Sequence, residues 1–165
     1  MPGTLRAWKA VLIFTLFAGC ALAQDDVAAL RSRFARDTDP IHRAKSMRQL
    51  GRAEFQEIEK DANAGELAQA LATLREYRDE AQSCEKALDD RGIDAEKHPN
   101  GFKQLQFSVR ESLLRLDDLL VTLTADQQKP FLEARQHLDT MNRHLLHELF
   151  PNNPAKSGPS EKPTG

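Results

Sequence analysis

The stretch that decides the fold is GFKQLQFSVRESLLRLDDLLVTL, residues 101–123. Projected at about 100° per residue, as in an α-helix, most of its apolar side chains fall on one side. This main stripe consists of Phe102, Leu105, Val109, Leu113, Leu116, Leu120 and Leu123. A stripe sustained over the whole segment predicts a long central helix that buries this side in the core of one domain.

A second apolar stripe lies on nearly the opposite side of the same segment and repeats every seventh residue. It consists of Phe107, Leu114 and Val121. Because a surface helix normally shows one apolar stripe, two interpretations are open. Either the domain covers the helix on two sides, or the second stripe is a face for a partner.

An apolar row near the N-terminus matches the second stripe in length. This row consists of Val27, Leu30 and Phe34. Burying a leucine fully is worth about 1.5–3 kcal/mol, enough to hold a short helix that is marginal alone. We therefore expect the leading helix, or the loop after it, to fold over Leu114.

The rest of the chain predicts helices with recognisable ends. Asp39-Pro40 combines a capping acid with proline at the first helical position, and Asn63-Ala64-Gly65 and Gly92 mark later helix ends. The helices are expected over about 25–34, 40–62, 66–90, 101–123 and 124–149, with an irregular turn before Pro130. Mostly short connections favour antiparallel neighbours. The predicted fold is therefore an all-α helical bundle of four main antiparallel helices plus a short N-terminal helix.

Length and composition limit the class of protein. The 165 residues are expected to form a single domain over 24–150, followed by a disordered tail over 151–165. Charged residues make up 29% and aromatic residues 6%, which suits a helical bundle better than a sheet. The formal net charge of −2 gives the chain no overall attraction to nucleic acid. No nucleic-acid partner is expected.

Residues 1–23 have the pattern of a secretory signal. Arg6 and Lys9 precede an apolar run over 10–18, and Ala21-Leu22-Ala23 forms a small-x-small cleavage site before Gln24. The run is too short for a permanent membrane anchor. A competing site, Leu16-Phe17-Ala18-Gly19-Cys20, resembles a bacterial lipobox, which implies a signal over 1–19 and lipidation of Cys20. Either cut places the protein in the envelope or outside the cell, with membrane contact only through Cys20.

Two short segments resemble known families. The first is Gly65-Glu66-Leu67-x-x-Ala70 with Leu74, which is similar to the turn and second helix of a tetratricopeptide unit. The resemblance covers about residues 44–88 and occurs once, whereas a solenoid usually needs at least three repeats. It implies a helical hairpin and no more.

The second segment is Leu123-Thr124-Ala125-Asp126-Gln127, which resembles the LTxxQ motif of small periplasmic stress chaperones and their metal-sensing relatives. The same residues also suit an ordinary capping box, in which Thr124 caps the helix and Gln127 reaches back to the cap amide. The capping interpretation is favoured.

Candidate chemistry is sparse. His137, His144 and Glu148 share one flank of the last helix and are the best candidates for a metal site, although no functional metal or other cofactor is expected. Cys84 falls in an apolar stripe and is expected in the core. The sequence contains no phosphate-binding loop, G-x-S-x-G elbow, HExxH or paired CxxC. We therefore expect no catalytic residues and no enzymatic activity.

Basic residues gather near the mature N-terminus, between Arg31 and Arg52. They could contact anionic headgroups in a lipidated form, although a solvated basic face is the simpler interpretation. The combined expectation is an exported bacterial envelope protein that acts as a non-catalytic interaction or scaffold module for a protein partner. The alternative is a periplasmic chaperone or metal-responsive protein of the LTxxQ kind.

Overall fold

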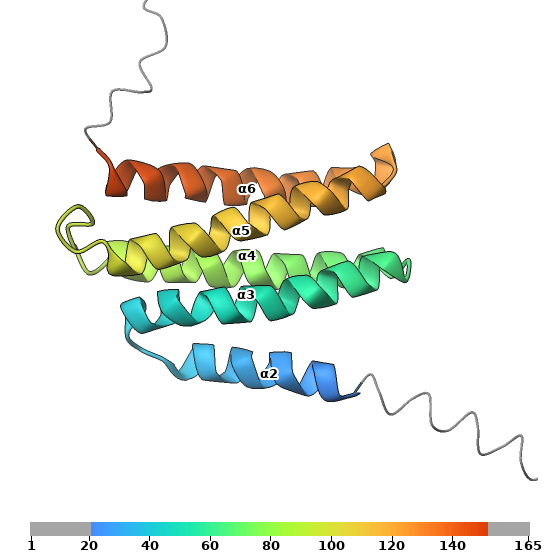
Figure 1. Cartoon of the computed structure of the whole chain (residues 1–165), viewed down its shortest axis with the longest axis horizontal. Coiled ribbons are helices and arrows are strands. Elements are labelled where there is room, and N and C mark those ends of the chain that lie inside the picture. Colours follow the sequence, from blue (N-terminus) through green and yellow to red (C-terminus); the bar gives the residue numbers. More distant parts are fainter. Residues whose placement is uncertain (1–20, 152–165) are drawn as a thin grey trace, which may run out of the picture.

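The computed structural model describes residues 21–151, and within them the chain is all helical (Figure 1). Its helices are α2 (Ala21–Arg36), α3 (Pro40–Asn63), α4 (Leu67–Asp89), α5 (Asn100–Thr122) and α6 (Ala125–Leu149). No helix in this part of the chain is long and apolar enough to cross a membrane. The predicted all-α bundle is confirmed.

Four helices form the bundle and one is added outside it. α3 packs against α4 and α5, and α6 packs against the same two helices, so the cyclic order is α3, α4, α6, α5. Consecutive helices run in opposite directions, while α3 and α5 run the same way (Figure 1). The longest connection, residues 90–99, joins α4 to the diagonally placed α5. Two helical hairpins thus pack side by side.

The leading helix does not cover the second stripe, so that prediction is wrong. Among the helices of the bundle, only α3 has its backbone close to that of α2. Val27 and Phe34 are buried in this contact, whereas Leu114 on α5 remains 60% exposed. Ion-pair partners on α3 and α4, described below, fix the position of α2. The apolar row in the sequence gives no indication of them.

The helix ends follow local chemistry. The Asp39 carboxylate accepts hydrogen bonds from the amides of Ile41 and His42 at 2.9 and 3.0 Å, and Gly65 and Gly92 have φ of 83° and 60°. In α6, the Gln127 side chain accepts a hydrogen bond from the Thr124 amide at 2.9 Å. The expected irregular turn is wrong: α6 is helical from Ala125, with Pro130 inside it. Pro130 is the sixth residue of α6 and has no amide hydrogen, so one backbone hydrogen bond near the start of the helix is missing.

The main stripe of α5 lies in the core, as predicted. From Phe102 to Leu120 all its members are buried, and Leu123 is half-buried against the same core. The buried side is wider than the stripe, because Gln106, Ser108 and Ser112 are buried too. The two serines face α3 and α4, so the buried side of α5 includes hydroxyl groups that belong to neither apolar stripe.

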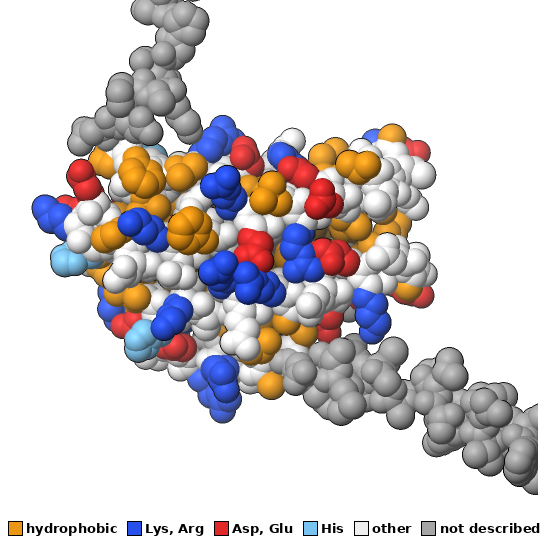
Figure 2. All heavy atoms as spheres, in the orientation of Figure 1, with side chains coloured by type: hydrophobic (Ala, Val, Ile, Leu, Met, Phe, Trp, Pro, Cys, Tyr) orange, Lys and Arg blue, Asp and Glu red, His pale blue; other side chains and the backbone are white. Residues whose placement is uncertain are grey.

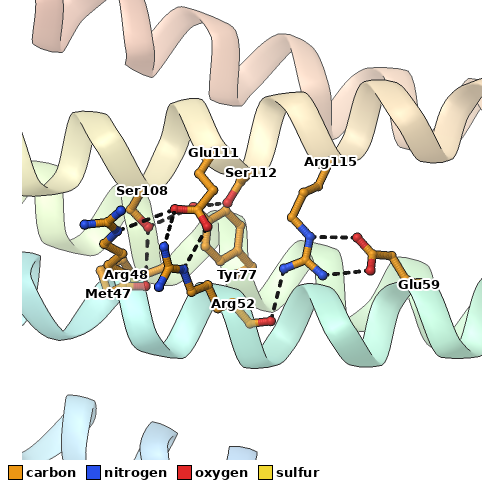
Figure 3. Close-up of polar contacts among 9 residues, drawn as sticks. All are labelled: Met47, Arg48, Arg52, Glu59, Tyr77, Ser108, Glu111, Ser112 and Arg115. Atoms are coloured by element: carbon orange, nitrogen blue, oxygen red, sulfur yellow. Dashed lines mark hydrogen bonds and ion pairs between the residues drawn. The ribbon is translucent and has the colours of Figure 1, made fainter.

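Tyr77 of α4 is the partner of these serines and is fully buried (Figure 3). Ser112 donates a hydrogen bond to the Tyr77 hydroxyl at 2.7 Å, and Ser108 Oγ lies 3.4 Å from it. Ser108 also donates to the Met47 carbonyl of α3 at 3.3 Å. Phe55 packs edge-on against the Tyr77 ring, with 5.2 Å between the two ring centroids. One aromatic side chain therefore joins α3, α4 and α5.

Gly51 of α3 leaves the space that this ring occupies. A Cβ at Gly51 would lie 2.7 Å from Tyr77 Cε2. We expect Gly51→Ala to destabilise the protein by about 1 kcal/mol. Overpacking typically costs about 1–3 kcal/mol, and the gain in helix propensity offsets up to about 1 kcal/mol of it. Urea unfolding followed by circular dichroism measures the difference.

Gly101→Ala is the matched control. Its Cβ would meet Leu88 Cδ2 at 2.6 Å, but that atom is the end of a flexible side chain that can change rotamer. Leu88 is fully buried, so this variant should also lose stability, but less than Gly51→Ala, whose clash is with a rigid ring. A Gly51→Ala protein as stable as Gly101→Ala would show that Tyr77 does not set the approach of the helices.

Candidate interaction surfaces

The second stripe of α5 is an exposed apolar row on the finished bundle. Phe107, Leu114 and Val121 are 48%, 60% and 85% exposed. At 1.5 Å per residue the row is about 21 Å long. Figure 2 shows hydrophobic side chains gathered over α5 and α6 on this face, interrupted by charged ones. Since α2 packs elsewhere, no described segment of the chain covers the row.

Ion pairs to the neighbouring helices flank the second stripe and hold α5 in place. On the α3 side, Glu111 binds Arg52 at 2.8 Å, and Arg115 binds Glu59 at 2.7 Å (Figure 3). On the α6 side, Asp117 binds Arg135. These pairs are partly exposed, so each contributes at most about 1 kcal/mol. Together they give the apolar row charged borders on a rigid helix.

Arg31 attaches the inner edge of α2 to the bundle. Its guanidinium lies 2.6 Å from Glu54 of α3, 2.6 Å from Glu76 of α4 and 3.8 Å from Glu80 of α4. Glu54 is fully buried, which is costly for a carboxylate without a cationic partner. Arg43 supports the same helix from α3, because its guanidinium stacks 4.5 Å from the Phe34 ring. The pairing of Arg31 with Glu54 explains why α2 packs on α3.

The carboxylates around Arg31 outnumber their cation. Burial, followed by the charge of Glu80, raises the pKa of Glu54 to about 8 although Arg31 opposes the shift. Burial raises the pKa of Glu80 as well. Glu54 Oε2 and Glu80 Oε2 are buried and have no hydrogen-bond partner among the described residues. The cluster therefore retains a proton near neutral pH.

The outer edge of α2 borders a groove of about 870 Å³ against α3, which we call the α2–α3 groove. Its apolar lining comes from Val27, Ala29, Leu30 and Ala53. Its basic lining comes from Arg33, Lys45, Arg48, Arg52 and Lys60, and Glu57 is the one acidic lining residue among the described side chains. Figure 2 shows basic side chains along the middle of this face, over α3. Part of the basic cluster predicted from the sequence therefore lines a concavity, while Arg31 points to the acidic cluster instead.

The histidine flank borders a smaller groove of about 530 Å³ between α4 and α6. His137 and His144 line it together with Glu85 and Asp89. His144 Nδ1 lies 3.0 Å from Glu85 Oε1, while Glu148 lies 3.9 Å from the other ring nitrogen. In residues 21–151, no three histidine, cysteine or acidic side chains are placed to hold a metal ion. The candidates His137, His144 and Glu148 do not converge on one point.

Cys84 is buried in the core, where the sequence placed it. Burial raises the pKa of its thiol to about 12, which keeps it in the unreactive protonated form at neutral pH. Cys20, the candidate lipidation site, and the predicted signal over 1–19 lie outside the described residues.

Sequence reasoning found the second stripe but missed the acidic cluster and the α2–α3 groove. Glu54 was the available signal, because it interrupts the apolar face of residues 44–62 at a position otherwise filled by core residues. A charged residue at a core position indicates a buried partner, which here is Arg31. The basic cluster between Arg31 and Arg52 indicated the charge of the groove but not its shape, because the lining comes from separate helices.

No protein-family model, curated protein or solved structure matches this chain. The functional argument therefore depends on the surfaces described above.

The shifted pKa of Glu54 predicts a pH-dependent stability. Its carboxyl group has an ordinary pKa of 4.5 and a folded value of about 8. Between these values the unfolded chain releases the proton and the folded chain keeps it. The free energy of unfolding should therefore decrease as pH rises through this window, on the order of 1–3 kcal/mol. Denaturant unfolding at successive pH values measures the slope.

Glu54→Gln should reduce this slope, because glutamine stays neutral and still offers an oxygen to Arg31. Glu59→Gln, which changes an exposed pair on the same helix, should leave the slope in place. An unchanged slope in Glu54→Gln would show that the proton is held elsewhere.

Proposed function

We propose that the protein is an exported, non-catalytic interaction module of the bacterial cell envelope. In this proposal, the second stripe of α5 is the face that binds a protein partner. The observation that carries it is the exposed row of Phe107, Leu114 and Val121 on an otherwise filled bundle. Exposed large apolar side chains in a row with charged borders are typical of protein-binding surfaces.

The spacing of the row favours a helix as the bound element. A repeat of seven residues is the period at which one helix meets another in left-handed packing. The three side chains are partly exposed, and each contributes up to about 1.5–3 kcal/mol when fully buried. With rim charges setting orientation, such a face suits a partner of moderate affinity.

The assignment to the cell envelope is supported by the N-terminal sequence. Among the side chains that the structure describes on α2, the buried Val27 and Phe34 both follow the two predicted cleavage sites. Cleavage after Ala23 or before Cys20 would therefore leave the docking side chains in place. The mass of the mature protein distinguishes Gln24 from lipidated Cys20 as its first residue, and an intact Met1 would contradict export.

A photo-crosslinker at position 114 tests the partner face. In cells of the native host, a group at Leu114 should crosslink to one discrete protein. The same group at Ala72, which is exposed on α4, should not. In the protein that carries the photo-crosslinker at position 114, the further substitutions Phe107→Ser and Val121→Ser should remove the adduct. They eliminate the remaining apolar side chains of the row. Both changes replace exposed side chains, so the thermal midpoint should stay within a few degrees.

Leu116→Asp provides the folding control, because this residue is fully buried and an aspartate there should unfold the domain. Equal adducts from positions 114 and 72 would contradict the proposed face. An adduct only with a second copy of the chain would make the second stripe a self-association surface instead.

A second candidate function is supported by the groove between α4 and α6. Its acids and histidines are the side chains that a metal-responsive protein of the LTxxQ kind would need. Because they do not converge, we expect zinc and copper to bind no tighter than about micromolar. Calorimetry on the wild type and on His144→Ala tests this. Tight one-to-one binding that disappears in His144→Ala would favour the second candidate over the first.

A further inference from the structure

The α2–α3 groove combines an apolar lining with unneutralised positive charge. Among the described residues, Arg33, Lys45 and Lys60 form no ion pair, whereas Arg48 and Arg52 share Glu111. Ala29, Leu30 and Ala53 supply apolar surface beside these exposed cations. A ligand that carries both negative charge and hydrocarbon would therefore complement both kinds of lining.

The charge is distributed unevenly along the groove. α2 and α3 run in opposite directions (Figure 1), and Arg31 of α2 binds Glu54 of α3. Arg33, Lys45 and Arg48 therefore lie toward the start of α3, while Val27 lies toward its end. The groove has a basic end formed by three side chains and a more apolar end that contains Lys60.

We propose that the α2–α3 groove binds one molecule of a single-chain anionic lipid. Its phosphate or carboxylate head pairs with Arg33, Lys45 and Arg48, and its acyl chain lies along Ala29, Leu30 and Ala53. The lining of this site comes from α2 and α3 except for Gln104 of α5, whereas the second stripe lies on α5 alone. Failure of either proposal therefore leaves the other intact.

The dimensions favour one lipid molecule over a small anion or a bilayer surface. Lys45 and Lys60 are separated by about 22 Å of helix. One acyl chain spans half of the hydrocarbon core, about 15 Å, so head and chain fit together along the groove. A free phosphate would leave the apolar lining unused. A flat bilayer surface would contact the rim of the groove and leave its recessed apolar lining uncovered.

The test titrates the protein purified from its host with four probes. These are short-chain lysophosphatidylglycerol below its micelle concentration, lysophosphatidylcholine of the same chain, inorganic phosphate and phosphatidylglycerol vesicles. Calorimetry should give saturable one-to-one binding to the anionic lysolipid. The zwitterionic lipid and phosphate should each bind at least about tenfold more weakly, since each lacks one of the two features.

Variants separate the groove from general charge. Arg33→Glu combined with Lys45→Glu should weaken binding of the anionic lysolipid at least about tenfold. Arg36→Glu, compared with Arg33→Glu alone, makes the same charge change on α2 outside the groove and should change affinity by less than about twofold at moderate salt. If the purified protein keeps its predicted signal, lipid bound to that segment would be unaffected by the groove variants. Thermal melting confirms that each variant is folded.

Three results would overturn the proposal. Equal binding of the zwitterionic and anionic lysolipids would remove the role of the basic end. Binding to vesicles without binding to the monomeric lipid would indicate a bilayer contact. An equal loss in Arg36→Glu and in Arg33→Glu would indicate a nonspecific charge effect.

Discussion

The packing of Tyr77 between α3, α4 and α5 is the constraint on which the other features depend. The ring fits because α3 has Gly51 at the contact and α5 presents the small Ser108 and Ser112. Once these serines face the ring, the rotation of α5 about its axis is fixed. The main stripe then lies in the core, and the second stripe must face solvent, because both are carried by one rigid helix.

A second constraint decides where α2 lies. Glu54 is buried on α3, and Arg31 is the residue that reaches it. Without the hydrogen bond from Arg31 the buried acid would lack this donor, so the contact places α2 on α3 together with the burial of Val27 and Phe34. The same docking leaves the opposite edge of α2 open beside the basic side chains of α3. The acidic cluster and the α2–α3 groove are thus two sides of one helix contact.

The buried polar groups of this bundle take part in contacts that hold the helices together. Tyr77, Ser108 and Ser112 bond to one another, Arg31 neutralises acids, and the Cys84 thiol is kept protonated by burial. The surfaces, by contrast, combine apolar side chains with charges in open positions, which is the arrangement used for binding. The proposed interaction module rests on these surfaces.

The sequence alone determined the all-α class, the approximate helix limits and the main stripe of α5, because periodicity and capping are local properties of a chain. It also singled out Phe107, Leu114 and Val121, but not whether the domain would cover them. That question, together with the burial of Ser108 and Glu54 and the site at which α2 docks, was decided only by the tertiary structure. In the sequence, Ser108 and Glu54 resemble surface residues, because their partners Tyr77 and Arg31 lie on other helices. A local pattern does not show which distant residue will be the partner.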